Sequence, residues 1–252
     1  AGVTAGSDSG FLRIRHSGTE MNGVQEGSAL FGMTTGVFGQ MRRHSIVTGN
    51  LVSFISSTVP DVGKAVDGLF FFGAATGRNA GITQGNPAGG AALGETFRVF
   101  TGLTRTGGLG LVRATLSGSR LLNEGVWDQN NILLLRKGDW AGGAGKETVS
   151  RILRVWGLNS GQMLCQVKLA GTGVTARNNE ALILRQANGM FYPLFCTGQH
   201  APGVGEDKVT VARILSIAVN TETGQYAILG SLRGAPGSSG GPSSPAAAAD
   251  AA

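Results

Sequence analysis

The stretch that decides the fold is Leu164-Cys165-Gln166-Val167-Lys168-Leu169, a short apolar segment that recurs along the chain. Similar segments lie at 51–55, 111–116 and 227–232. Each follows a turn rich in Gly or Asn, residues that tolerate the positive φ angles of tight hairpins. These segments recur about every 60 residues, and a repeat of that length predicts a modular β architecture.

The segments around this stretch recur in the same order. An apolar segment precedes it at 37–41, 96–100, 148–153 and 210–215, and another follows it at 67–72, 130–136 and 179–185. A Gly-rich loop closes each copy at 85–89, 138–142 and 198–203. Three or four antiparallel strands per copy are typical of a β-propeller blade, and such sheets stack to cover their faces. We therefore predict an all-β repeat fold of about four to five three- or four-stranded antiparallel units, most like a β-propeller.

The composition agrees with one large β domain rich in turns. The chain has 43 Gly in 252 residues, and 41% of its residues are hydrophobic, which argues against general disorder. We expect a lead-in at 1–10, a single repeat domain at 11–233 and a flexible Gly/Ser/Pro/Ala tail at 234–252. The repeats would start near residues 11, 51, 111, 164 and 227.

The net charge of +6 includes a local cluster of positive side chains at Arg42 and Arg43. Such a surface could bind an acidic polysaccharide or another polyanion, or be an ordinary solvated face. No aromatic-interleaved basic motif for nucleic acid is present.

Three tryptophans and one histidine are the other candidate binding residues. Trp127, Trp140 and Trp156 could form a sugar-stacking surface or pack in the core. His200 replaces Trp140 and Pro87 of the sister loops, which fits either a special role or loop drift.

The two cysteines, Cys165 and Cys196, could form a disulfide in an oxidising compartment or remain two buried thiols. No C-x-x-C spacing is present, so we expect no metal site, and nothing indicates a cofactor. The sequence has no stretch of about 20 apolar residues, so we expect no transmembrane segment.

One catalytic motif is visible, at 237–242. Gly-Ser-Ser-Gly-Gly-Pro is similar to the nucleophile motif of chymotrypsin-like proteases, with Ser239 in the nucleophile position. Ser238 occupies the family's Asp position, and the motif lies in the low-complexity tail with no strand after it. We therefore predict no catalytic residue and lean towards a protein that is not an enzyme.

The repeat resembles that of secreted bacterial proteins described by the motif N-x-x-G-x-x-x-F. The residues that carry the resemblance are Asn159-Ser160-Gly161, the turn from Asn220 to Gly224, the run from Leu135 to Asp139, and His200-Ala201-Pro202-Gly203. The resemblance implies an extracellular or cell-surface β-propeller-like protein and no known enzymatic activity.

The last recurring segment begins a repeat that the sequence does not complete. This candidate assembly strand contains Ala227, Ile228, Leu229 and Leu232, and it would pair with the strand around 11–14, closing a ring, or with a neighbouring molecule. The first hypothesis is therefore a structural or adhesive protein that self-associates. The alternatives are a glycan- or polyanion-binding propeller module, and a hydrolase or lyase that acts on polysaccharide.

Overall fold

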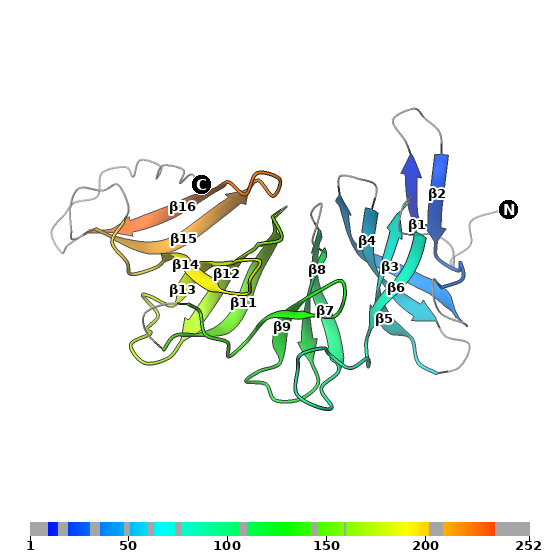
Figure 1. The fold of residues 1–252 in the computed structure, drawn as a ribbon, viewed down its shortest axis with the longest axis horizontal. Helices are drawn as coiled ribbons and strands as arrows, with labels where there is room; N and C mark the ends of the chain where they lie inside the picture. Colours follow the sequence, from blue (N-terminus) through cyan, green and yellow to red (C-terminus); the bar gives the residue numbers. More distant parts are fainter. Residues whose placement is uncertain are drawn as a thin grey trace. The chain divides into compact units, whose positions relative to one another are not determined.

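The computed structural model describes residues 10–14, 20–30, 36–47, 51–59, 63–73, 77–105, 110–142, 146–158, 160–201 and 209–234 (Figure 1). Every regular element in these ranges is a strand, so the predicted all-β class is confirmed. The strands are β1 (Gly10–Ile14), β2 (Glu20–Gln25), β3 (Val37–Val47), β4 (Leu51–Val59), β5 (Val66–Gly73), β6 (Gly77–Thr83), β7 (Phe97–Arg105), β8 (Gly110–Leu116), β9 (Glu124–Asp128), β10 (Leu133–Arg136), β11 (Thr148–Gly157), β12 (Met163–Ala170), β13 (Glu180–Arg185), β14 (Phe191–Cys196), β15 (Thr210–Val219) and β16 (Tyr226–Arg233).

Strands that follow one another along the chain pair with one another, so each sheet is a meander. The three four-stranded sheets are β3-β4-β5-β6, β7-β8-β9-β10 and β11-β12-β13-β14, and the two-stranded sheets are β1-β2 and β15-β16. The pairings are antiparallel. Short turns join β9 to β10, β13 to β14 and β15 to β16, and the last of them contains the predicted Asn- and Gly-rich hairpin signal.

The described residues form two compact units. The first contains β1 to β8 together with residues 127–133, and the second contains residues 118–126 and the chain from Leu134 onward. Of the predicted tail at 234–252, residues 235–252 with the Ser239 motif lie outside the described residues, as do residues 1–9 of the predicted lead-in at 1–10.

One turn, with the same hydrogen bonds each time, leads into β3, β7, β11 and β15. A glycine with positive φ donates its N–H to a carbonyl of the following strand at 2.7–2.9 Å. The same strand residue donates its N–H back to the residue after the glycine, at 2.8–3.0 Å. The four glycine–strand pairs are Gly27–Phe38, Gly85–Phe97, Gly138–Val149 and Gly198–Val211. The chain is therefore a tandem repeat of antiparallel sheet units.

These turns define the equivalent strand positions. In three copies the strand before the turn is the fourth strand of its sheet: β6, β10 or β14. In the first copy that strand is β2, so β2 is equivalent to a fourth strand and β1 to a third. After the last copy of the turn, β15 and β16 are equivalent to the first and second strands of a sheet. The first hairpins agree, because β3-β4, β7-β8, β11-β12 and β15-β16 each contain two register shifts, and the last three place them at equivalent residues.

One predicted strand is misplaced. The apolar run at 130–136 was expected to be a third strand, but it contributes β10, the fourth strand of its sheet, and β9 is the third. The physical reason is a tight turn between them. One carboxylate oxygen of Asp128 accepts the N–H groups of Asn130 and Ile132, each at 2.8 Å, and Asn131 has a φ of 63°.

Within the first compact unit, consecutive sheets pack face to face. Apolar side chains of the β3–β6 sheet meet those of β7 and β8 in one buried cluster with Trp127; it includes Ile55, Leu69, Phe71, Ile82, Phe97, Phe100, Val112 and Leu116. A second cluster centres on Phe38, Phe54 and Phe70, with ring centroids 4.8–5.7 Å apart.

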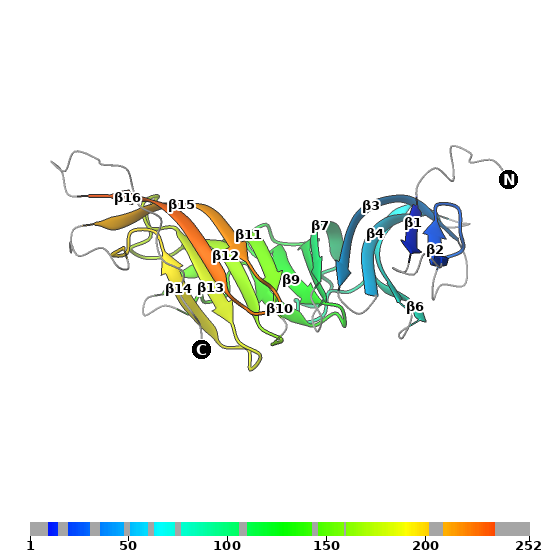
Figure 2. The ribbon, with the colours of Figure 1, turned by 90° about the horizontal axis from the view of Figure 1, so that it is seen from above.

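The second compact unit repeats this arrangement. Leu164 and Leu182 of the β11–β14 sheet pack against Ile214 and Ile217 of β15. Figures 1 and 2 both show the β15-β16 hairpin beside that sheet. Burial of apolar faces between stacked sheets, at about 25 cal/mol per Å², is the main stabilising term for such a fold.

Candidate functional site

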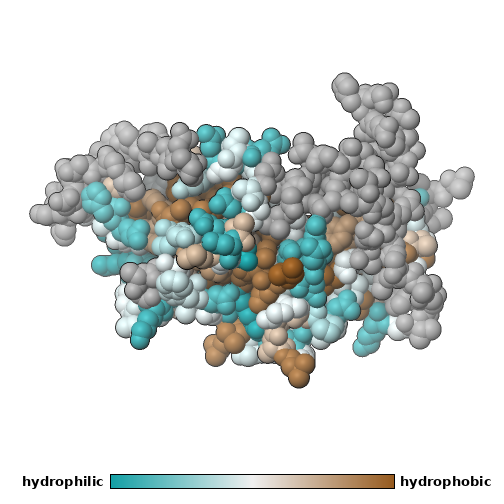
Figure 3. Space-filling model, viewed as in Figure 1, coloured by the Kyte–Doolittle hydropathy of each residue, from teal (hydrophilic) through white to brown (hydrophobic). Residues whose placement is uncertain are grey.

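The first candidate site is the open edge of β16. The equivalent strands β4, β8 and β12 each pair with a third strand, whereas β16 pairs only with β15 among the described strands. Its apolar side chains are correspondingly uncovered. Leu232 is 39% exposed, whereas the equivalent Leu169 of β12 is 8% exposed, and Leu229 is 51% exposed. Figure 3 shows apolar surface over this hairpin.

The second open edge belongs to β1. This third-position strand pairs only with β2 in the part of the chain that the structure describes, whereas β5, β9 and β13 each pair with a second strand. Unpaired strand edges present free N–H and C=O groups and readily accept another strand. The two edges are complementary, because one needs a third strand and the other a second.

A different site lies in the β11–β14 sheet of the second compact unit. A cavity of about 330 Å³ opens between β13, β14 and the turn that enters the sheet. Its lining includes Ala141, Glu147, Leu169, Ile183, Cys196 and Thr197.

The cavity exists because the third strand of this sheet has a smaller side chain than its counterparts. The residue before each turn glycine donates its N–H to a carbonyl near the start of the third strand: Gln84 to Asp67, Lys137 to Glu124 and Thr197 to Glu180. The third residue beyond these acceptors is Phe70, Trp127 and Ile183, respectively.

The aromatic side chains of Phe70 and Trp127 fill the corresponding space in their own sheets. Trp127 is fully buried and packs with Ala88 and Leu116, the equivalents of the cavity-lining Ala141 and Leu169. Its indole N–H donates to the Gly89 carbonyl at 2.9 Å. In the β11–β14 sheet Ile183 leaves the corresponding volume open.

One cavity-lining residue, Glu147, has a buried carboxylate oxygen. Its Oε2 has no hydrogen-bond partner among the residues that the structure describes. In the equivalent residue of the preceding sheet, Glu95, this oxygen accepts the Ala92 N–H at 2.8 Å. Burial, together with the Glu147 carboxylate, raises the pKa of the Cys196 thiol, so Cys196 is a neutral wall of the cavity rather than a nucleophile.

Cys165 and Cys196, for which the sequence left open a disulfide or two thiols, are both free thiols. Cys165 lies on β12 opposite Ile183, and Cys196 lies on β14 opposite Ala181, so β13 separates them. Two strand spacings amount to roughly 10 Å, beyond the Cα separation of at most about 7 Å that a disulfide allows.

The three tryptophans do not form one stacking surface. Trp127 is buried in the core, as the alternative reading of the sequence allowed. Trp140 is 55% exposed and bridges to Thr148 at the start of β11, whereas Trp156 lies near the other end of β11 and packs against the β15-β16 hairpin. About eight residues of strand, roughly 25 Å, separate the last two.

His200 is exposed and occupies the same turn position as Pro87 and Trp140, each of which bridges to the start of the next strand. Its role as a binding residue stays a prediction.

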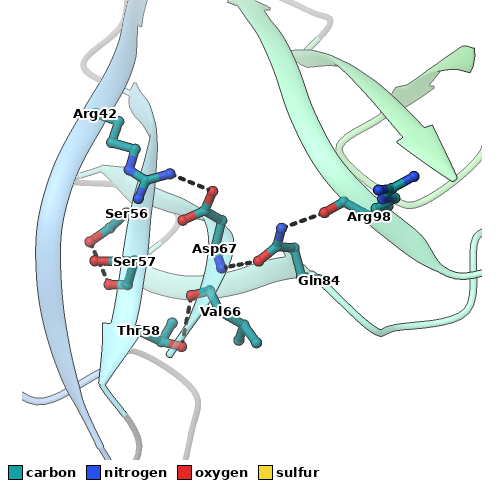
Figure 4. Close-up of polar contacts among 8 residues, drawn as sticks. All are labelled: Arg42, Ser56, Ser57, Thr58, Val66, Asp67, Gln84 and Arg98. Carbon is teal, nitrogen blue, oxygen red and sulfur yellow. Dashed lines mark hydrogen bonds and ion pairs between the residues drawn. The ribbon is translucent and has the colours of Figure 1, made fainter. Parts of the chain in front are cut away.

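The two arginines lie exposed on β3. Arg42 forms an ion pair with Asp67 at 2.8 Å, and the Asp67 N–H donates to Gln84 at 2.6 Å (Figure 4). Gln84 in turn donates to the Arg98 carbonyl (Figure 4). Arg42 thus takes part in contacts between strands, and polyanion binding by Arg42 and Arg43 stays a prediction.

Sequence reasoning missed Glu147 and Ile183. Ile183 occupies the position that Phe70 and Trp127 occupy in the other two sheets. This difference can be recognised in the sequence only when β9 is aligned as a third strand. Nothing in the sequence shows that the Glu147 oxygen is buried.

Comparison with family models, with curated proteins and with solved structures gives no match to this chain. Within the described ranges, no helix is long and apolar enough to cross a membrane. The same ranges contain no group of three or more His, Cys, Asp or Glu side chains that could hold a metal ion.

Proposed function

We propose that this chain is a non-enzymatic structural or adhesive protein of the extracellular or cell-surface space that assembles head to tail. In this proposal the stacked sheets are blades of a propeller-like repeat. Strand β16 of one molecule pairs with β1 of the next, giving a four-stranded sheet in the order β15-β16-β1-β2. The observation that carries the proposal is the complementarity of the two half-sheets. The resemblance of the repeat to secreted proteins supports the location.

The repeat predicts the register of this pairing. In complete sheets the second and third strands place Phe54 opposite Phe70, and Cys165 opposite Ile183. The positions equivalent to Cys165 and Ile183 are Ile228 on β16 and Leu12 on β1. The neighbouring pair, equivalent to Gln166 and Leu182, is Leu229 and Phe11.

A small side chain at a fixed position supports the assignment of β1. Gly10 lies opposite Gln25, as Gly68 lies opposite Thr83 and Ala181 opposite Cys196. All three partners are the second residue before a turn glycine, so β1 and β2 keep the register of a third and a fourth strand.

The exposed edge provides a driving force. Pairing along the five residues of β1 would form on the order of five backbone hydrogen bonds, each with a net contribution of about 1 kcal/mol. A neighbour would also cover Leu229 and Leu232, which are uncovered now. Because the contact is head to tail and the described strands of each molecule offer one open edge of each kind, it would build chains.

Light scattering and negative-stain electron microscopy of the purified protein test the proposal. We expect particles that grow with concentration. Ile228→Pro should abolish growth, because the alternation of the antiparallel ladder turns this N–H away from β15 and towards the open edge. Leu215→Ser is the matched control: it removes an exposed apolar side chain from β15 without touching the edge and should leave assembly unchanged. A monomer at every concentration would contradict the proposal.

A further inference from the structure

We infer that the side chains of Lys168 on β12 and Asn179, the residue before β13, join in an isopeptide bond, with Glu180 as the base for its formation. Lys168 Nζ donates to Glu180 Oε2 at 2.7 Å and to Asn179 Oδ1 at 3.3 Å. An amine in contact with both an amide and a carboxylate has the groups that this reaction needs. The inference is independent of the proposed assembly, because all three residues belong to one hairpin of the β11–β14 sheet.

The sheet holds the reacting groups in place. The Leu169 N–H donates to the Asn179 carbonyl at 2.8 Å, and Lys168 lies opposite Glu180 in the ladder. Gln166 donates to the other carboxylate oxygen of Glu180, Oε1, at 2.6 Å, which leaves Oε2 for the lysine. Because Oδ1 is about 1.23 Å from the amide carbon of Asn179, the amine lies within about 4.5 Å of that carbon. A small movement of the lysine chain therefore brings the two atoms together, and such positioning removes much of the barrier to reaction.

The contact is mostly covered. The side chain of Lys168 is 35% exposed and that of Glu180 is 14% exposed. Val167 and Leu169, on either side of the lysine, are buried. Partial burial strengthens the attraction between the ammonium and the carboxylate, and it keeps much of the competing water away from the reacting atoms.

The reaction balances without any further reagent. Glu180 takes a proton from Lys168, and the neutral Nζ attacks Cγ of Asn179 to form a new C–N bond. The bond from Cγ to Nδ2 then breaks. Nζ keeps one of its three protons, and Nδ2 takes up the other two by way of Glu180, so it leaves as ammonium. The product is an amide that links the two side chains, and Glu180 ends as a carboxylate again.

The preceding sheet offers a comparison within the same chain. Asn123-Glu124 is the counterpart of Asn179-Glu180, but Thr115 occupies the position of Lys168. A threonine has no amine, so that sheet contains the amide and the carboxylate without the attacking group. We therefore expect one cross-link from these two sheets, not two.

Intact-mass spectrometry of the purified full chain, unfolded before measurement, tests the inference. The expected mass is that of the sequence less one molecule of ammonia. Digestion with trypsin should then leave residues 155–177 joined to residues 178–185, because trypsin does not cleave after an acylated Lys168. A chain with the full mass of its sequence would overturn the inference.

Two variants assign the reaction to its residues. Lys168→Arg keeps a positive charge beside Glu180 but removes the attacking amine, and Glu180→Gln keeps the shape but removes the base. Neither folded variant, as checked by circular dichroism, should lose ammonia. An asparagine can also lose ammonia by forming a succinimide with its own backbone, and that reaction does not need Lys168. Loss of ammonia that persists in either folded variant, or that occurs without the joined peptides, would overturn the inference.

Discussion

Replacing Trp127 by alanine should produce a large loss of stability. The indole is fully buried and packs in an edge-to-face arrangement with Phe97, with ring centroids 4.9 Å apart. Its N–H donates to the Gly89 carbonyl. Truncation of a buried aromatic side chain costs about 3–5 kcal/mol, and the loss of the hydrogen bond leaves the Gly89 carbonyl unpaired. We therefore expect a loss of about 4 kcal/mol in the free energy of unfolding.

Urea unfolding followed by far-UV circular dichroism measures this effect. With a slope of about 2 kcal/mol per M, the midpoint should fall by about 2 M. Trp140→Ala is the matched control, because this side chain is 55% exposed, and its truncation should change stability by less than about 0.5 kcal/mol. Equal midpoints for the two variants would refute the placement of Trp127 in the core and return it to the set of surface binding residues.

Other consequences of the structure can be measured directly. Asn131→Ala should lower the free energy of unfolding in urea by about 2 kcal/mol, because Asn131 has a φ of 63° and its side chain forms hydrogen bonds with Gly89 and Pro87. A change below about 0.5 kcal/mol, the usual scatter of surface substitutions, would contradict the described conformation of that turn. Burial raises the pKa of both thiols, and Cys165 is fully buried whereas Cys196 is only partly buried. Alkylation by iodoacetamide at pH 8 should therefore be slow at Cys196 and undetectable at Cys165 by mass spectrometry. Rapid labelling of both would show that they are not buried as described. Arg42→Ala should change stability by less than about 1 kcal/mol in a thermal melt, because its ion pair with Asp67 is half exposed, and a larger loss would mean that the contacts of Figure 4 act cooperatively.

Much of the fold could be predicted from local patterns. Strands β4, β8, β12 and β16 are apolar segments that follow Gly-rich or Asn-rich turns, and each is the second strand of its sheet. The sequence did not predict strand β9, because Glu124-Gly125-Val126-Trp127-Asp128 has no apolar run. The Leu-rich run after it resembles a third strand instead. The side chain of Asp128 decides between the two assignments, and its hydrogen bonds cannot be read from composition.

The candidate sites were predictable to different degrees. The candidate assembly strand at Ala227 to Leu232 was predictable because it needs only the order of segments along the chain. The cavity needed the alignment of Ile183 with Trp127 and the position of Glu147 beside residues of β13 and β14. Such a site depends on contacts between segments far apart in sequence, and short-range patterns do not contain them.

The most direct test of the proposed assembly is a register-specific disulfide between two molecules. Phe11→Cys and Leu229→Cys would be combined in a chain whose own thiols are replaced by their counterparts in sister sheets, Cys165→Val after Val112 and Cys196→Thr after Thr83. After mild oxidation, non-reducing electrophoresis should show a ladder of covalent oligomers. Arg13→Cys with Leu229→Cys, two residues out of register, should give little. A chain that cross-links only within itself, or not at all, would contradict head-to-tail pairing of β16 with β1.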